Sequence, residues 1–375
     1  PGSENWVCLV PENVHKERGH VTVPDEDIPM GSYRESDGQL RNYRAAVSST
    51  GEYTAFHGGT VALGLAAITT SMNRVNGVYE RDVAVRMTLI ANNNLIVYTN
   101  SGTDPYSNDN PSQLLSQSQS NIDAVIGNAN YDVGHTVSTG GGGVAQLGVP
   151  CETGGKASGV TGTSTPVGDP FDIDYLAHEL GHQFGGNHTF NGNGGSCSGN
   201  RSASSAYEPG SGSTIMAYAG ICGSANDLQS NSDAYFHARS LQEIIAYVTT
   251  GNGNSCPTKT NTGNLNPTAN AGASYTIPLS TPFALTGSGS DPNGDAITFC
   301  WEQYNLGAAG APASPSGDAP IFRSFNPTTS PTRVFPKWSN ISNNTTTIGE
   351  LLPSYARTLT FRLTVRDNRA GGGRI

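Results

Sequence analysis

Three histidines and one glutamate fall within eleven residues of this 375-residue chain, in the stretch HELGHQFGGNH that begins at His178. His178 and His182 are four residues apart, so on a helix both side chains project from one face about one turn apart. Glu179 lies between them in sequence. Gly185 can end the helix in a left-handed conformation, after which the chain doubles back to His188. Three imidazoles placed in this way are suited to Zn²⁺ and leave its fourth position for water, as catalytic zinc sites do.

The alternative is a surface helix on which the histidines fall by chance. H-E-x-x-H alone is a moderately common accident. The glycine at +7 and the histidine at +10 bring the fixed positions to five, each matched by chance roughly one time in twenty. The full pattern therefore favours a metal site.

The stretch also matches the H-E-x-x-H-x-x-G-x-x-H pattern of the metzincin metalloproteases. These proteins carry a tight turn with methionine beneath the zinc, and STIMAYAG supplies Met216 at 28 residues after His188. The order of strands and helices before the motif, the approach DPFDIDYLAHELGHQF and a closing helix most resemble the reprolysin (adamalysin) branch, in a bacterial secreted form. The resemblance covers residues 39–257.

This resemblance implies a role for each matching residue. His178, His182 and His188 would be the zinc ligands, Glu179 the general base that activates a zinc-bound water, and Met216 the hydrophobic floor of the site. The implied function is a secreted zinc-dependent endopeptidase that hydrolyses proteins or peptides. The alternative is a catalytically idle adhesion or binding protein on the same scaffold, and the intact base and ligand set favour the enzyme.

Tyr218 stands two residues after the methionine. In the astacin and serralysin branches a tyrosine at this spacing can bind the metal or an oxyanion, which suggests a catalytic role here. The alternative is an aromatic ring packed in a half-buried position.

The cysteine pattern is typical of secreted proteins. Six cysteines without a C-x-x-C pair indicate up to three disulfides and an oxidising compartment, with buried free thiols as the alternative. Cys197 with Cys222 is the expected pair. Cys8 either forms a disulfide or, as a thiolate ahead of a metzincin domain, acts as a latch on the zinc.

The same bulk properties limit the partners. A net charge of −10 without a basic run argues against nucleic acid and anionic membranes. No apolar run approaches the ~18 residues of a membrane span. We therefore expect a secreted monomer that acts on proteins or peptides.

Alternating strand and helix patterns predict an α/β catalytic domain with a mixed twisted sheet, and the short alternating strands that follow predict an all-β immunoglobulin-like sandwich. Helices are expected at 58–82, 111–129, 170–184 and 232–250, with strands at 41–49, within 83–98 and around the glycine run 140–143. The predicted domains are an N-terminal extension with the character of a propeptide remnant (1–38), the metalloprotease (39–257), a linker (258–268) and the sandwich (269–375), which lacks an expected final strand.

The last module loosely resembles the polycystic-kidney-disease type found on secreted bacterial hydrolases. It is expected to bind substrate, a glycan or the cell surface, or to serve as a spacer. Its SDPNGD stretch offers Asp291, Asn293 and Asp295 as oxygen ligands for Ca²⁺, with a plain turn as the alternative. His135 and His237 lack partners at ligand spacing and are expected to be structural or surface residues.

Overall fold

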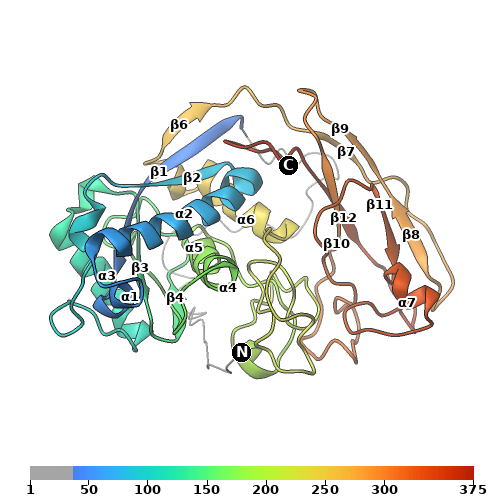
Figure 1. Ribbon diagram of the computed structural model, residues 1–375. Coiled ribbons are helices and arrows are strands. Elements are labelled where there is room, and N and C mark those ends of the chain that lie inside the picture. The colour runs from blue at the N-terminus through green and yellow to red at the C-terminus, as the bar shows by residue number, and fades with distance from the viewer. Residues whose placement is uncertain (1–36) are drawn as a thin grey trace. The chain divides into compact units, whose positions relative to one another are not determined.

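The computed structural model describes residues 37–375. Its described residues form two compact units, one of 39–187 and 243–262 and the other of 37–38, 188–242 and 263–375. Figure 1 labels their elements. This division follows contacts, whereas the domain boundaries at 38, 257 and 268 follow composition, and those boundaries stay a prediction.

The first unit is built on a mixed six-stranded sheet in the order β2-β1-β3-β5-β4, with β6 also paired to β1. β1, β2, β3 and β5 run parallel, while β4 is antiparallel to β5 and β6 is antiparallel to β1. The strands are β1 (Gln39–Ser49), β2 (Val85–Leu89), β3 (Val133–Ser138), β4 (Gly142–Ala145), β5 (Gly159–Gly162) and β6 (Thr258–Asn261).

Helices cover both faces of this sheet. They are α1 (Gly51–Phe56), α2 (Val61–Val83), η2 (Asn93–Ile96), α3 (Pro111–Val125), η3 (Asn128–Asn130), α4 (Asp169–Phe171), η4 (Asp172–Ala177), α5 (His178–Gln183), α6 (Ala238–Thr249) and η6 (Asn252–Asn254). α4, η4 and α5 follow one another without a break, and η4 is a π-helix. The predicted helix at 170–184 therefore exists, with a π turn before the histidine motif.

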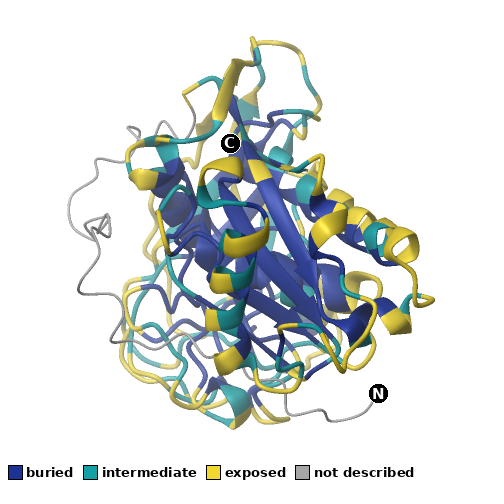
Figure 2. Cartoon of the chain, turned by 90° about the vertical axis from the view of Figure 1, so that its left-hand side faces the viewer, coloured by how far each residue is buried: buried dark blue, intermediate teal, exposed yellow. Residues whose placement is uncertain are grey.

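Side chains of β1 point alternately to the two faces of the sheet, and their contacts show which helices cover each face. The ring of Tyr43 lies 5.1 Å from that of Phe184, directly after α5, and the ring of Tyr79 in α2 lies 5.9 Å from the same Phe184. Ala46 points the other way and packs with Ile122 of α3. Because successive side chains of a strand face opposite sides, α2 and α5 cover one face and α3 the other. Figure 2 shows the central strands in the dark blue of buried residues.

The second unit joins a long irregular segment to antiparallel strand pairs. Between 188 and 237, all of which the structure describes, the only helix or strand is η5 (Gly195–Cys197). The pairs are β7 with β9, β8 with β11 and β10 with β12. Their bounds, with one short helix, are β7 (Thr268–Asn270), β8 (Phe283–Thr286), β9 (Ser288–Ser290), β10 (Thr298–Gln303), β11 (Thr332–Phe335), α7 (Trp338–Ser342) and β12 (Phe361–Arg366).

These pairs enclose an aromatic core of Trp301, Phe322 and Phe335, with Phe283 and Phe361 against it. The strands agree with the predicted all-β module, and its immunoglobulin-like assignment stays a prediction.

One expected helix boundary is wrong, and the predicted linker contains a strand. The closing helix begins at Ala238 rather than at 232, because the backbone N–H of Ala238 donates to the Glu302 carboxylate at 3.0 Å, which supplies a helix N-terminus with its acceptor. Residues 258–261, assigned by composition to a linker, form β6 against β1.

Two disulfides join described residues. The predicted Cys197–Cys222 bond is confirmed, and Cys151–Cys256 is a second. Cys300 is a buried free thiol, and burial raises its pKa to about 12. Cys8 lies outside the described residues, so the latch is untested. No helix within 37–375 has the length and apolar character that a membrane crossing requires.

Candidate metal centre

The helix that carries the first two histidines ends as the sequence predicts. Gly185 has φ +94°, in the left-handed region that favours glycine. The N–H of Gly185 donates to the carbonyl of His182 at 2.9 Å, and the N–H of Gly186 donates to that of Gly181 at 2.8 Å. This pair of bonds is the Schellman motif. It turns the chain sharply after α5 and brings it back towards the helix at His188.

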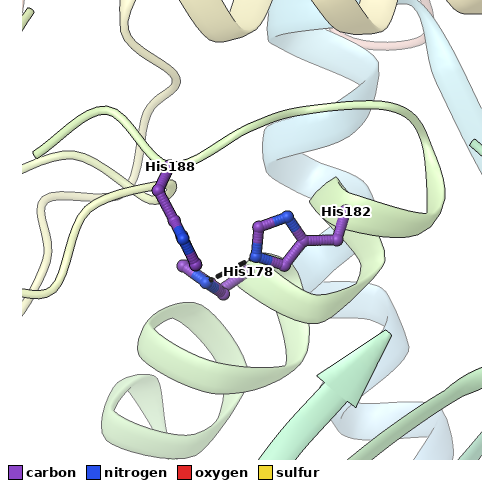
Figure 3. A group of neighbouring side chains, drawn as sticks. All are labelled: His178, His182 and His188. Atoms are coloured by element: carbon purple, nitrogen blue, oxygen red, sulfur yellow. Dashed lines mark hydrogen bonds between the residues drawn. The ribbon is translucent and has the colours of Figure 1, made fainter. Parts of the chain in front are cut away.

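The turn brings the three histidines together. Their ring nitrogens offer one atom each within 4.8 Å of one another, and all three residues are buried. The Nε2 atoms of His178 and His182 lie 3.0 Å apart. Figure 3 shows the three rings pointing toward a common centre, two from α5 and one from the returning chain.

Backbone carbonyls fix the protonation of two of these rings. The Nδ1 of His182 lies 2.7 Å from the oxygen of Gly186, and the Nδ1 of His188 lies 2.6 Å from that of Asn200. A carbonyl only accepts hydrogen bonds, so each Nδ1 carries the proton and each Nε2 presents a lone pair. Partners of this kind orient metal-binding histidines. Nitrogen lone pairs that converge in this way fit a cation, and three imidazoles suit Zn²⁺.

A disulfide holds the loop that supplies the second carbonyl. The N–H of Asn200 donates to Cys197 at 3.2 Å, and its side chain donates to Ser196 at 2.9 Å. Cys197 is bonded in turn to Cys222. The disulfide predicted from the sequence therefore fixes the carbonyl that orients His188.

Glu179 lies on α5 against the edge strand β4. It is fully buried, and a Cβ added to Gly143 would stand 2.2 Å from its Oε1. Gly143 therefore makes the room that the carboxylate occupies. Burial and the nearby charge of Glu179 raise the pKa of Tyr79 well above its ordinary value, so its hydroxyl stays protonated and donates to Ala177 at 2.7 Å.

Met216 and Tyr218 lie beside the third histidine in the second unit. The N–H of Thr189 donates to the carbonyl of Met216 at 3.0 Å, and Met216 is fully buried. The Tyr218 ring lies 4.6 Å from the His188 ring and 4.5 Å from that of Phe190. The structure thus brings both predicted residues next to the histidine.

Residues 40–248, more than half of the chain, match the family described as Metallo-peptidase family M12B Reprolysin-like. The chain belongs to this family. It is a zinc metallopeptidase of the metzincin class, as the motif predicts, and peptidases of this kind act on proteins. No curated protein matches the chain.

The other histidines of this reprolysin-like chain that the sequence singled out are structural. The Nδ1 of His135 lies 2.8 Å from Oε1 of Gln183 and its Nε2 lies 2.9 Å from the Thr161 hydroxyl, while burial lowers its pKa to about 4. His237 is buried, with Nε2 3.8 Å from the Glu302 carboxylate.

The predicted calcium ligands are only partly brought together. Asp291 and Asp295 place carboxylate oxygens within 4.8 Å of Asp367. The side-chain oxygen of Asn293 accepts from the N–H of Leu265 at 2.7 Å. Calcium binding stays a prediction, and Asp367 is a further carboxylate beside Asp291 and Asp295.

Several residues around the reprolysin-like centre were not found from the sequence. The carbonyls of Gly186 and Asn200 leave no signal in residue type, because any residue can supply a carbonyl. Gly143 lies in the glycine run 140–143, around which the sequence predicts strands but no contact with Glu179. Glu208, a buried carboxylate, is separated from the motif by a loop without periodicity.

Proposed function

We propose that this reprolysin-like metallopeptidase is an endopeptidase in which Glu179 is the general base. The observation that carries the proposal is the buried carboxylate of Glu179 on the same helical turn as His178 and His182. General bases need a defined position beside the proton that they accept. Neither the base nor a ligand is missing, which argues against an idle adhesion protein.

The three histidines and Glu179 have different roles in this proposal. His178, His182 and His188 hold Zn²⁺, which when bound polarises the scissile carbonyl and lowers the pKa of a water molecule. Glu179 accepts a proton from the attacking water and later delivers it to the leaving nitrogen. Its burial keeps bulk water away from the carboxylate, which strengthens its interactions with charge that develops nearby.

The edge strand β4 is proposed to hold the substrate. β4 is the last strand in the sheet order and is antiparallel to β5. The backbone at the outer edge of a sheet can accept an extended peptide as an additional strand, although the four residues of β4 are themselves buried. Because Gly143 lies against Glu179, a peptide beside β4 would run past the base.

Tyr218 is proposed to stabilise the oxyanion. Its ring contact with His188 supports a position near the reacting carbonyl. Tyr218→Phe keeps the ring and removes the hydroxyl, so we expect kcat to fall by about 10-fold with little change in KM, since one donor in such a site contributes at most ~10²–10³. An unchanged kcat would leave the packed-aromatic alternative.

Secretion and a binding role for residues 269–375 are further parts of the proposal. The two disulfides support an oxidising, extracellular location. The C-terminal module shares a compact unit with 188–242, and the Tyr235 hydroxyl lies 2.6 Å from that of Ser324. We therefore propose that the C-terminal module also stabilises residues 188–242, in addition to binding substrate or a surface.

The test is cleavage of an unfolded protein such as casein by the chain and by Glu179→Gln, each loaded with zinc. We expect cleavage by the parent, and a fall of at least ~10³-fold in the variant with zinc still bound. Equal cleavage by both would show that Glu179 is not the base. Zinc binding without cleavage of casein or of mixed peptides by the parent would favour the adhesion alternative.

A further inference from the structure

A buried carboxylate connects the third histidine to the methionine turn. Glu208 is 1% exposed and lies within the segment 188–242. Burial of an ionised side chain is expensive unless hydrogen-bond donors surround it. The donors that surround this carboxylate belong to Thr189, which follows His188, and to Ser213 and Thr214, which precede Met216.

Both oxygens of Glu208 accept hydrogen bonds from the methionine turn. The N–H of Ser213 donates to Oε1 at 2.9 Å and the N–H of Thr214 donates to it at 3.2 Å. The hydroxyl of Thr214 donates to Oε2 at 2.6 Å. Thr214 precedes Met216 by two residues, so the carboxylate fixes the backbone that enters the turn.

The other contact reaches the residue after His188. The hydroxyl of Thr189 donates to Oε2 at 2.5 Å. The backbones also run together, since the N–H of Glu208 donates to Thr189 at 2.8 Å and the N–H of Asn191 donates to Glu208 at 2.8 Å. The chain directly after the ligand is thus tied to Glu208 by both its backbone and a side chain.

We infer that Glu208 is a positioning residue that holds His188 and the methionine turn in one arrangement and so sets the affinity of the site for zinc. This inference rests on the proposed metal site. A carboxylate suits the position because it only accepts hydrogen bonds, and every group aimed at it donates. An amide would serve the two N–H groups with its oxygen but would turn its own donors toward the hydroxyls of Thr189 and Thr214.

The first experiment measures zinc affinity by competition with a chelator, for the full chain and for Glu208→Gln. We expect the Kd for zinc to rise by about 10-fold, in line with the loss of other groups that orient metal ligands. Glu350→Gln is the matched control, because Glu350 is equally buried and accepts from Lys337 and Arg333 within the C-terminal module. It should lower the melting temperature and leave the Kd for zinc unchanged.

Kinetics provide a second readout. With zinc in excess, Glu208→Gln is expected to lower kcat for casein-derived peptides by about 10-fold and to leave KM nearly unchanged, because Glu208 is buried and out of reach of a peptide. If both Gln variants lower the melting temperature equally and neither changes the Kd for zinc or kcat, Glu208 is only structural and the inference is wrong.

Variants of Thr189 provide a second test of the inference if Glu208→Gln does not fold. Thr189→Val removes the hydroxyl at nearly constant volume, and Thr189→Ser retains it. We expect a Kd for zinc several-fold higher for the valine variant and restored for the serine variant. Equal zinc affinities in the two would overturn the inference. Zinc affinity is measured independently of cleavage. A parent that binds zinc and cleaves nothing would refute the proposed function, whereas the zinc affinity of Glu208→Gln would still test the inference about Glu208.

Discussion

The two parts of the metal centre are built in different ways. Residues 169–183 form one uninterrupted helical run, α4, η4 and α5, which ends in a hydrogen-bonded turn at Gly185. Residues 188–237 contain only the short η5, yet every residue from 205 to 219 is buried. The helical run carries His178 and His182, and the irregular segment carries His188 and the residues that position it.

The difference lies in the range of the interactions. In the helix, most backbone groups find their partners within five residues, and the carbonyls of His182 and Gln183 also accept from the N–H groups of Gly148 and Val149. In the irregular segment, buried backbone groups must find partners elsewhere: the N–H of Thr189 donates to Met216, and those of Ser213 and Thr214 donate to the Glu208 carboxylate. The Cys197–Cys222 disulfide and the C-terminal module hold the same segment through other contacts. Such a segment depends on a few distant contacts, so single changes at those contacts should reach the metal, while equally large changes in the first unit should not.

The two disulfides give the largest expected effects. Cys151 and Cys256 are separated by 105 residues and Cys197 and Cys222 by 25. Their replacement by serine should lower the free energy of unfolding by about 4.8 and about 3.5 kcal/mol, from the loss of loop-closure entropy. Only the Cys197→Ser/Cys222→Ser variant should also raise the Kd for zinc, by about 10-fold, because it releases the Asn200 carbonyl that orients His188.

Urea unfolding and chelator competition on both double variants check this prediction, and each variant is the control for the other. A rise in the zinc Kd of the Cys151→Ser/Cys256→Ser variant alone would reverse the comparison. Equal rises in both would show that zinc affinity follows stability and not the position of one carbonyl.

Low pH should reduce the free energy of unfolding of the first unit, because His135 is buried. Its pKa is about 4 in the folded chain, against 6.5 for an ordinary histidine, because burial disfavours the charged ring. Between these two values the unfolded chain binds the proton more readily, so the free energy of unfolding falls as pH falls through this window. The stabilisation is fully present above about pH 6.5, and about 3 kcal/mol is lost by pH 4.

His135→Asn removes this titration. Urea unfolding at pH 7 and at pH 4 should show a loss on acidification that is about 3 kcal/mol smaller in the variant than in the parent. Identical losses in both would mean that His135 accepts a proton in the folded state without penalty.

The regular part of the centre was predictable from the sequence. The spacing of His178 and His182, the glycine at 185 and the return to His188 are statements about one helix and one turn, and local geometry decides them. The same holds for β1, α2 and α3, whose apolar periodicity is clear. The disulfide Cys197–Cys222 was found because it is the shortest pairing.

In the irregular part, the motif predicts Met216 and Tyr218 and the spacing predicts the disulfide, but the other contacts were not predictable, since the fold chooses these partners. The start of α6 at Ala238 depends on Glu302, 64 residues away. Asn200 contributes a backbone carbonyl, which any residue type could supply. Asp367 joins Asp291 and Asp295 because β12 ends beside them, and no local pattern in SDPNGD contains that information.

Gly143 tests how closely the first unit is fitted around the base. Gly143→Ala would place a methyl group 2.2 Å from Oε1 of Glu179, so the carboxylate must move. We expect kcat/KM for a peptide substrate to fall by about 100-fold, as for a displacement of about 1 Å in an active site. Overpacking should also lower the free energy of unfolding by ~1–3 kcal/mol.

Gly141→Ala is the matched control for this strand. No atom lies within 4 Å of the added Cβ at Gly141, so both activity and stability should be close to those of the parent. A Gly143→Ala variant of full activity would show that Glu179 tolerates a shift and that the fit between β4 and α5 is loose.

The smallest expected effect reaches the metal from the C-terminal module. The Ser324 hydroxyl accepts from that of Tyr235 at 2.6 Å and donates to the Glu302 carboxylate at 2.9 Å. The Ser324 carbonyl accepts from the Ser213 hydroxyl at 3.2 Å. Ser324→Ala leaves two buried groups short of a partner and should lower the free energy of unfolding by ~1–3 kcal/mol. The variant retains the Ser324 carbonyl, so it acts on the metal through a shift of this backbone and of Ser213, which also donates to Glu208. The Kd for zinc should therefore rise about two- to threefold. Thr328→Ala is the control, since Thr328 is exposed and, among the described residues, its hydroxyl bonds only to Ser330. If Ser324→Ala lowers stability and leaves zinc affinity unchanged, the module stabilises the segment without setting the position of His188, and the irregular region is less sensitive to distant contacts than the comparison requires.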